Sequence, residues 1–260
     1  MRCCIAHPPP RSDDAVNAQG ERPVALITGS GRRVGRAIAE ALGSRGYHVA
    51  AHYNESADGA REVRNAIVAL GGSCDLFAAD LTMSDAPAAV VEDVVTRCGR
   101  LDVLINSAAM MLRTPFGDVT AADWDRMFAL NLRAPFLLTQ AAAAPLRSAR
   151  GCVVNISDLA AFETWPGYVP HGISKAGVVQ MTRALAHVMA PDVRVNAVAP
   201  GAVLLPEDWD EASAARLAAT TPLKRVGTPA DVVGAVLYLV DAAYVTGHTI
   251  VVDGGRHVRH

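Results

Sequence analysis

The sequence predicts an α/β fold in which a doubly wound parallel sheet of about seven strands forms a single domain. From residue 23 onward, short apolar segments bounded by turn residues alternate with longer amphipathic segments. The short segments lack an apolar–polar alternation, so we expect helices to cover both faces of the sheet. Strands joined through helices pair in parallel by right-handed crossovers. Hydrophobic residues make up 51% of the chain, which is enough for such a core.

The predicted elements follow one another in a regular order. Strands are expected at Val24–Thr28, His48–Tyr53, Cys74–Ala79, Val103–Asn106, Cys152–Ser157, Arg194–Val198 and Thr249–Val252. After the first strand, apolar residues at positions 34, 37, 38, 41 and 42 form one helical face. Further helices are expected at Ser56–Leu70, Ala86–Cys98, Ala121–Arg147, His171–Ala190 and Asp231–Asp241.

Composition excludes several function classes. The formal charge of −2 provides no basic field for nucleic acid or an anionic membrane. No run of 18 apolar residues exists, so no membrane span is predicted. Residues 1–22 are rich in proline and polar residues and lack the apolar stretch of a signal peptide, so we interpret them as a flexible tail before a domain at 23–260.

Cysteine and histidine usage argues against disulfides and metal sites. The five cysteines are Cys3, Cys4, Cys74, Cys98 and Cys152, an odd number without a C-x-x-C motif. Such scattered thiols favour a reducing cytoplasm. The histidines His48, His187, His248 and His257 form no spaced cluster with carboxylates, so the sequence predicts no metal.

The turn after the first strand has the composition of a phosphate-binding loop. It reads Thr28-Gly29-Ser30-Gly31-Arg32-Arg33-Val34-Gly35, and a helix follows at once. Small residues allow the backbone to approach a pyrophosphate, and the helix N-terminus attracts the anion. The second strand ends at His52-Tyr53 without the acidic residue that holds the ribose in NAD enzymes. Arg33 and Ser56 instead favour the 2′-phosphate of NADPH, although Glu55 lies close by.

From residue 23 onward the chain resembles the short-chain dehydrogenase/reductase family, which has a Rossmann-type fold. The turn is similar to the family's T-G-x-x-x-G-x-G, with Arg33 in place of the middle glycine. Other family motifs are matched by Asp80-Leu81, Asn106-Ser107-Ala108, Asn131, Pro200-Gly201 and Val252-Asp253-Gly254-Gly255. The resemblance implies a cofactor site of Gly29, Arg32, Arg33, Val34, Gly35, Tyr53, Asn54, Ser56, Asp80, Leu81, Asn106, Ser107, Ala108, Lys175, Pro200, Gly201 and Val203. It also implies a cytoplasmic homotetramer.

Within that family the chain is similar to the pteridine reductases and dihydromonapterin reductases. The features that carry this likeness are the T-G-x-x-x-R-x-G turn, Asn155-Ile156-Ser157-Asp158, the stretch 199–206, and the end Asp253-Gly254-Gly255-Arg256-His257-Val258-Arg259. Asp158 occupies the position of the catalytic serine of most family members. The resemblance therefore implies an NADPH-dependent reductase of a C=N bond in a dihydropterin-like heterocycle.

The catalytic motif departs from the family at one position. Lys175 is present, but the residue four positions before it is His171 rather than tyrosine. His171 and Lys175 share a helix face, and an imidazole can deliver a proton near neutral pH. Lys175 favours the neutral ring and Asp158 the imidazolium. We expect Asp158, His171, Lys175 and Asn131 to be catalytic, with Tyr168 as an alternative proton donor and a loss of catalysis as the opposing interpretation.

The substrate side of the site also departs from the pteridine reductases. Met111 stands where those enzymes place an aromatic that stacks on the pterin, and Ala109 stands where a serine often binds it. Met110 and Met111 fit core packing equally well. The predicted substrate contacts are Arg33, Met111, Asp158, His171, Leu205, Pro206 and Trp209. Two alternatives stay open, a ketone or aldehyde reductase and a non-catalytic NADP(H)-binding protein.

Overall fold

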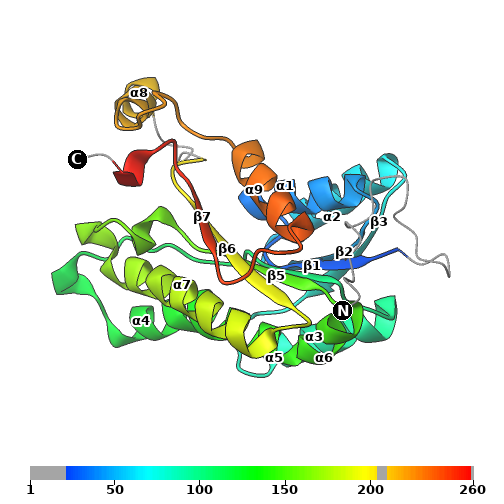
Figure 1. Ribbon diagram of the computed structural model, residues 1–260. Coiled ribbons are helices and arrows are strands. Elements are labelled where there is room, and N and C mark those ends of the chain that lie inside the picture. Colours follow the sequence, from blue (N-terminus) through cyan, green and yellow to red (C-terminus); the bar gives the residue numbers. More distant parts are fainter. Residues whose placement is uncertain (1–21, 204–209, 259–260) are drawn as a thin grey trace, which may run out of the picture.

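A seven-stranded parallel sheet forms the centre of the protein, in the order β3-β2-β1-β4-β5-β6-β7 (Figure 1). The computed structural model describes residues 22–203 and 210–258. Its strands are β1 Val24–Ile27, β2 His48–Tyr53, β3 Ser73–Ala78, β4 Val103–Asn106, β5 Cys152–Ile156, β6 Arg194–Pro200 and β7 Thr249–Val252. Every adjacent pair is parallel. The predicted fold class and all seven strands are confirmed: three strands have the predicted ends, and the ends of the other four shift by one or two residues.

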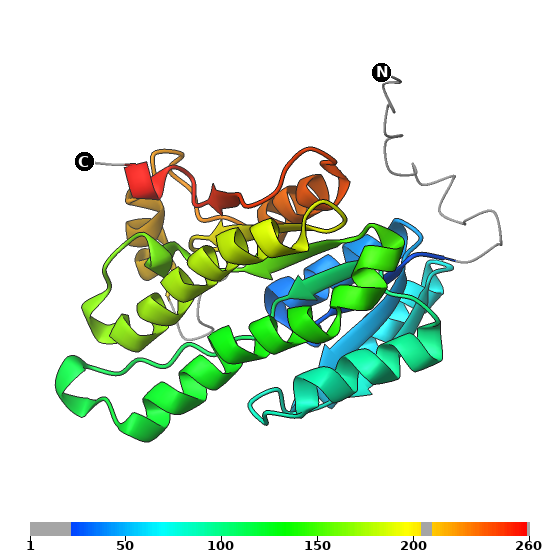
Figure 2. The ribbon, with the colours of Figure 1, turned by 60° about the horizontal axis from the view of Figure 1, so that its bottom comes forward.

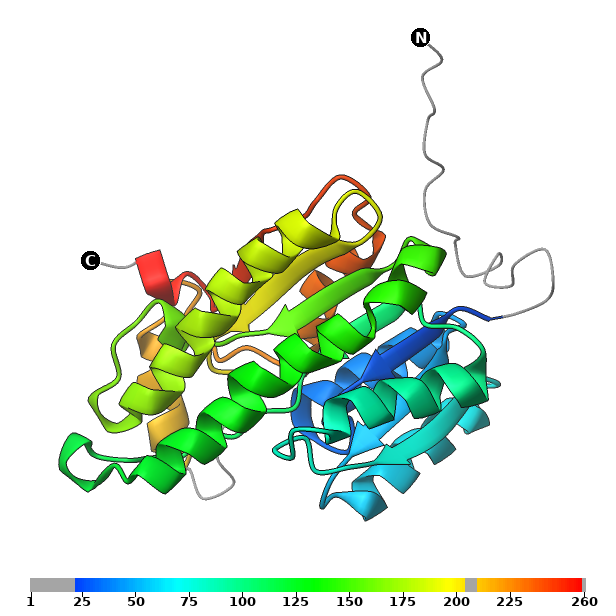
Figure 3. The same ribbon diagram turned by 90° about the horizontal axis from the view of Figure 1, so that it is seen from below.

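Helices cover both faces of the sheet, which explains why the strands are apolar on both sides. One face carries α1 Arg33–Ser44, α2 Ala57–Ala69 and α9 Pro229–Asp241. The other carries α3 Ala86–Cys98, α5 Ala134–Ala141, α6 Ala143–Ala149 and α7 Val169–Met189. Figure 3 shows this second layer from outside, with the run that contains α5 lying beside α7. In β1, Leu26 packs in the second layer and Ile27 in the first.

The single helix predicted over 121–147 is wrong in detail, because it is divided into several pieces. Helix α4, Ala121–Phe128, passes into a π-helical turn at Ala129–Arg133 before α5 begins (Figure 2). Pro135 has no N–H to donate to the carbonyl of residue 131, and Pro145 has none for residue 141. Each proline therefore lies just after a point where the regular series of α-helical hydrogen bonds is interrupted. Helix α8, Glu211–Ala219, is a further element that the sequence analysis did not anticipate.

Two buried asparagines connect the central strands to helix α7. Asn106 and Asn155 are register partners in β4 and β5, and Asn106 Nδ2 donates to Asn155 Oδ1 at 2.8 Å. Asn155 Nδ2 donates in turn to Thr182 Oγ1 at 2.9 Å. We call this row the amide ladder. It lies in an otherwise apolar layer, at the end of the sheet toward which the strands run.

No helix in the described ranges combines the length and the apolar character needed to cross a membrane.

Candidate active site

A cleft of about 780 Å³ opens at the carboxyl ends of the central strands. In doubly wound folds this edge is where ligands bind. Most of the predicted cofactor residues line it: Gly29, Arg32, Arg33, Val34, Gly35, Asn54, Ser56, Asp80, Leu81, Ser107, Ala108, Lys175, Pro200, Gly201 and Val203. Asp158, His171 and Met111 line the same cleft. The structure thus brings together residues from seven separate segments of the chain.

The turn between β1 and α1 has a shape that only glycine allows at two positions. Gly29 has φ +66°, and a Cβ there would lie 2.9 Å from the Ala108 backbone. At Gly35 a Cβ would lie 2.3 Å from the carbonyl oxygen of Gly29. Helix α1 begins at Arg33 without a capping side chain among the described residues. The turn and the helix N-terminus therefore form a cradle suited to a pyrophosphate.

The side chain of His52 is hydrogen-bonded to this turn, a role that sequence analysis missed. Its Nδ1 lies 3.3 Å from the Gly29 N–H, and its Nε2 lies 3.1 Å from the Ala79 carbonyl oxygen. An N–H donor on one side and a carbonyl acceptor on the other require the neutral ring with its proton on Nε2. Burial lowers the pKa of His52 to about 4, which keeps the ring neutral. The apolar strand pattern around His52 carried no signal of this role.

Positive charge and a hydroxyl meet at the outer end of the cleft. Arg32 and Arg33 are exposed at the start of α1, and both line the cleft. A Cβ on Gly31 would lie only 2.4 Å from Ser56 Oγ, so the start of α2 is in close contact with the turn. Glu55 lines the cleft beside them. Two guanidinium groups near a hydroxyl suit an anionic group such as a phosphate.

Lys175 lies deep in the cleft with a strongly perturbed ammonium group. Its Nζ donates to the Ile156 carbonyl oxygen at 2.8 Å, and only 4% of the residue is exposed. Burial lowers the pKa of Lys175 to about 8, and the Asp158 carboxylate opposes this shift. Ser157 Oγ donates to the Lys175 carbonyl oxygen at 2.9 Å, so the proton of this hydroxyl is already used in a hydrogen bond within the protein.

Asp158 and His171 form a pair at the inner end of the cleft. His171 Nε2 lies 3.7 Å from Asp158 Oδ2, is buried, and has no hydrogen-bond partner within the described residues. The other carboxylate oxygen, Oδ1, accepts from the Ala160 N–H at 2.7 Å, which orients Asp158. On its far side, His171 Nδ1 lies 3.3 Å from the Met110 carbonyl oxygen. The ring thus lies between two acceptors, and only the imidazolium has a proton for each.

Asn131 positions His171 by two routes without lining the cleft. Asn131 accepts from the Met110 N–H and donates to the Met110 carbonyl oxygen, both at 2.9 Å. It also donates to Ser174 Oγ at 3.1 Å, and that hydroxyl donates to the His171 carbonyl oxygen at 2.7 Å. Asn131 lies within the π-helical turn. These bonds use the Asn131 side chain and favour a positioning role, while its catalytic role stays a prediction.

Other predicted site residues are placed elsewhere. Tyr53 is not among the residues that line the cleft, and the side-chain amide of Asn106 is used in the amide ladder, so their predicted contacts with the cofactor stay predictions. Leu205, Pro206 and Trp209 lie outside the described residues. Met111 lines the cleft and is 48% exposed, so it is available to a substrate and does not fill the core.

The sequence analysis missed an aromatic wall on the substrate side. Trp165 and Tyr168 line the cleft and meet edge to face, with ring centroids 6.3 Å apart. Arg256 also lines it and pairs with Glu163, whose Oε2 is 3.0 Å from Arg256 Nη2 and also accepts from Trp165 Nε1 at 3.0 Å. The chain end that carries Arg256 thereby fixes the indole. The only sequence signal for this contact is the motif at the end of the chain that contains Arg256, and that motif does not indicate a contact with Trp165.

Comparisons with known proteins agree with this architecture. A family profile described as enoyl-(acyl carrier protein) reductase matches residues 29–257. A 3-oxoacyl-[acyl-carrier-protein] reductase of Synechocystis is 34% identical over 89% of this chain and 96% of its own length. The protein FixR of Bradyrhizobium diazoefficiens is 37% identical over 94% of this chain and 91% of its own. The crystal structure of the angucycline C-6 ketoreductase LanV with bound NADP superposes with a TM-score of 0.85 at 31% identity, covering 91% of this chain and 96% of that one.

Proposed function

Since this chain belongs to the short-chain dehydrogenase/reductase family, it is an oxidoreductase, and we propose that it reduces a polarised double bond with NADPH and with His171 as the proton donor. The observation that carries the proposal is the buried imidazole of His171, which faces the cleft beside Asp158 and Lys175. The family tyrosine is replaced by a residue that can also donate a proton.

The residues that line the cleft have the chemistry needed to bind NADPH. Gly29 and Gly35 leave room where a Cβ would fill the cradle, and helix α1 begins there. Arg33 and Ser56 suit the 2′-phosphate, and Lys175, which lines the same cleft, would hold the nicotinamide ribose. When bound, NADPH supplies the hydride, and the protein supplies orientation and the proton.

His171 is suited to deliver that proton. As an imidazolium it would donate from Nδ1 to the Met110 carbonyl oxygen, and its Nε2, 3.7 Å from Asp158 Oδ2, would carry the proton that passes to the substrate. The Nδ1 proton stays on the Met110 side. Asp158 orients the ring and supports recharging from solvent, because its carboxylate is partly exposed.

A C=N bond in a dihydropterin-like heterocycle is the substrate class that Asp158 favours. Protonation of a ring nitrogen creates an N–H group, and a nearby carboxylate accepts from it. A carbonyl would instead develop negative charge beside Asp158, which opposes the reaction electrostatically. Trp165 and Tyr168 give the cleft an aromatic wall for a planar ring.

A ketone is the second candidate, and the relatives support it. The Synechocystis protein is named a 3-oxoacyl reductase, and LanV is named a ketoreductase. Neither name mentions a pterin. With a ketone, the His171 proton would go to the carbonyl oxygen and compensate for the Asp158 charge.

A substrate panel separates the two classes and tests the function. NADPH oxidation is followed with dihydrobiopterin, a cyclic imine, a β-ketoacyl thioester, an aromatic polyketide-like ketone, and no substrate. For a C=N reductase, Asp158→Ser should lower turnover of the pterin or imine at least tenfold and improve ketone turnover. Turnover of ketones alone by the wild type would assign the second candidate. Binding of NADPH without turnover of any compound would contradict an enzymatic role for this chain.

Replacing Arg33 tests the cofactor preference. Arg33→Ala should weaken NADPH binding by roughly tenfold or more, because a charge-assisted contact to the 2′-phosphate contributes about 1.5–3 kcal/mol. The affinity for NADH, which lacks that phosphate, should change little. Fluorescence titration with both cofactors measures this, and Arg36→Ala, on the same helix but outside the cleft lining, is the control. A wild type that binds NADH as tightly as NADPH would contradict the assignment.

We also propose that the chain forms a homotetramer, as its family resemblance implies, and that it works in the cytoplasm, as its scattered cysteines favour. A second groove of about 1020 Å³ lies between α4, α5 and α7 and is lined by apolar side chains that include Phe128, Leu132 and Phe136. Phe136 is 42% exposed. Such a surface suits a second copy of the chain, and light scattering measures the assembly.

A further inference from the structure

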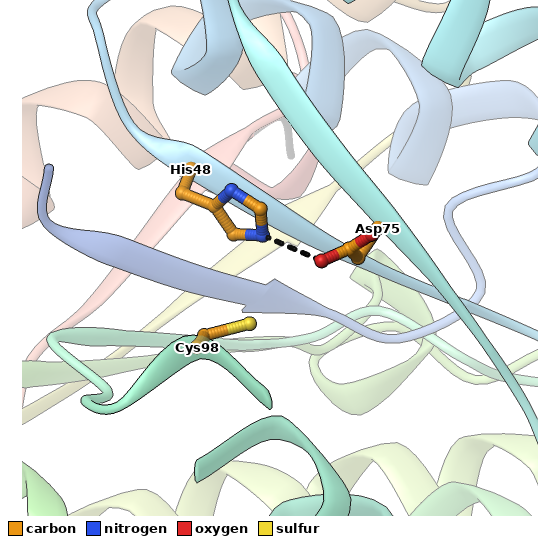
Figure 4. A group of neighbouring side chains, drawn as sticks. All are labelled: His48, Asp75 and Cys98. Carbon is orange, nitrogen blue, oxygen red and sulfur yellow. Dashed lines mark ion pairs between the residues drawn. The ribbon is translucent and has the colours of Figure 1, made fainter. Parts of the chain in front are cut away.

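Three side chains with metal-binding atoms meet at the amino edge of the sheet, opposite the cleft. His48 is the first residue of β2, Asp75 is the third of β3, and Cys98 is the last of α3. Their ligand atoms all lie within 4.8 Å of one another. Figure 4 shows the His48 ring and the Asp75 carboxylate facing each other, with the Cys98 sulfur directed toward the same space. None of the three lines the cleft.

His48 presents a nitrogen that the protein leaves without a hydrogen bond. Nε2 is buried and has no hydrogen-bond partner among the described residues, although it lies 3.4 Å from Asp75 Oδ2. On the other side of the ring, Nδ1 lies 3.0 Å from Ser73 Oγ. When Nδ1 donates to Ser73, the lone pair of Nε2 is available to a metal.

Asp75 divides its two oxygens between different partners. Oδ2 faces His48, while Oδ1 lies 3.4 Å from Arg97 Nη2. Arg97 is itself held over the Phe77 ring at 4.2 Å. The guanidinium therefore orients the carboxylate through one oxygen and leaves the other for a cation. Metal-ligating carboxylates commonly have such an outer hydrogen-bond partner.

We propose that His48, Asp75 and Cys98 bind a Zn²⁺ ion, with water as the fourth ligand. One imidazole nitrogen, one carboxylate oxygen and one thiolate sulfur suit zinc, which is tetrahedral and accepts all three donor types. Binding replaces the thiol proton: the S–H bond of Cys98 is broken, the sulfur–zinc bond forms, and the proton passes to solvent. All three residues are partly exposed, which gives the ion a path of entry.

The proposed ion would join three elements that are distant in sequence. It would connect the C-terminus of α3 to the starts of β2 and β3, of which β3 is an edge strand of the sheet. Because the cleft lies at the opposite edge, the ion would stabilise the fold and take no part in hydride transfer. The sequence analysis predicted no metal, because intervals of 27 and 23 residues between the ligands form no recognisable spacing.

Cobalt titration of the full chain, stripped of metal with a chelator, tests the site. Co²⁺ bound to a thiolate gives a sulfur-to-metal charge-transfer band, and Zn²⁺ should displace it. We expect the band in the wild type and its loss in Cys98→Ser, which removes this thiol and leaves the other four cysteines in place. His48→Gln and Asp75→Asn should keep the thiol and weaken Co²⁺ binding by at least tenfold. His187 is an exposed residue of α7, so His187→Ala is the control and should bind Co²⁺ as the wild type does.

Thermal unfolding gives an independent readout. Zn²⁺ should raise the Tm of the wild type and of His187→Ala, and not that of Cys98→Ser, because a ligand that binds the folded state stabilises it. Circular dichroism confirms that each variant is folded. An unchanged band in Cys98→Ser, or a wild type with neither a band nor a Zn²⁺-dependent Tm, would overturn the proposal.

Discussion

Replacing His171 by alanine should lower the turnover of a confirmed substrate by roughly 10²–10⁴-fold, the usual contribution of a positioned general acid. The structure supplies the reason, since the His171 ring lines the cleft and lies between Met110 and Asp158, with Nε2 on the Asp158 side. NADPH affinity should change little, because the phosphate-binding turn lies elsewhere in the cleft. Steady-state turnover and fluorescence titration of NADPH measure the two effects separately.

Two further variants make this result specific. His187→Ala, an exposed histidine on the same helix α7, should keep the wild-type rate. His171→Tyr restores the family residue and should retain part of the activity, with a pH profile shifted upward because a phenol holds its proton to about pH 10. Wild-type turnover by His171→Ala would mean that the proton comes from Tyr168 or from water.

Replacing Lys175 by methionine should weaken NADPH binding by roughly 10- to 100-fold, which is the loss of a charge-assisted contact of about 1.5–3 kcal/mol. The same ammonium predicts a pH dependence of binding. Its pKa is lowered to about 8, so the charge is present below that pH and is lost as the pH rises through it. Wild-type NADPH affinity should therefore fall above pH 8, and Lys175→Met should show no such fall. Titrations from about pH 6 to about pH 10 test this.

Asp158→Asn provides the matched control for Lys175. The Asp158 carboxylate raises the pKa of Lys175 against the effect of burial, so its neutralisation should move the decline of NADPH affinity to lower pH. His171→Ala should leave the decline where it is. If affinity were flat across this range in the wild type, Lys175 would not contribute its charge to cofactor binding.

The sequence predicted the sheet and many of the residues that line the cleft, because their signals are local. Glycines that follow a strand and precede a helix define the phosphate-binding turn, and Gly29 and Gly35 prove to have no room for a side chain. The spacing of His171 and Lys175 on one helix likewise placed both in the cleft. Periodicity did not reveal the break before Pro135, because the apolar pattern continues through the π-helical turn.

What the sequence could not show depends on contacts between distant segments. His52 sits in an apolar strand, and only the fold reveals that it joins the Gly29 turn to Ala79. Arg256 and Trp165 meet through Glu163, which lies 93 residues before Arg256 in the sequence. The cluster of His48, Asp75 and Cys98 is assembled in the same way from three elements. Side chains of this kind carry no local pattern, so their roles emerge only when the strands are aligned.

The amide ladder has a consequence for how the chain avoids misfolding. Asn106 and Asn155 lie opposite each other and are hydrogen-bonded. The Asn155 amide also donates a hydrogen bond to Thr182 on α7. A slip of either strand by one residue would turn its amide to the other face of the sheet. That face is the apolar layer beneath α1 and α9, where an unpaired amide is costly. The apolar strands alone would tolerate several alignments, whereas the ladder penalises every shifted one and so selects a single register.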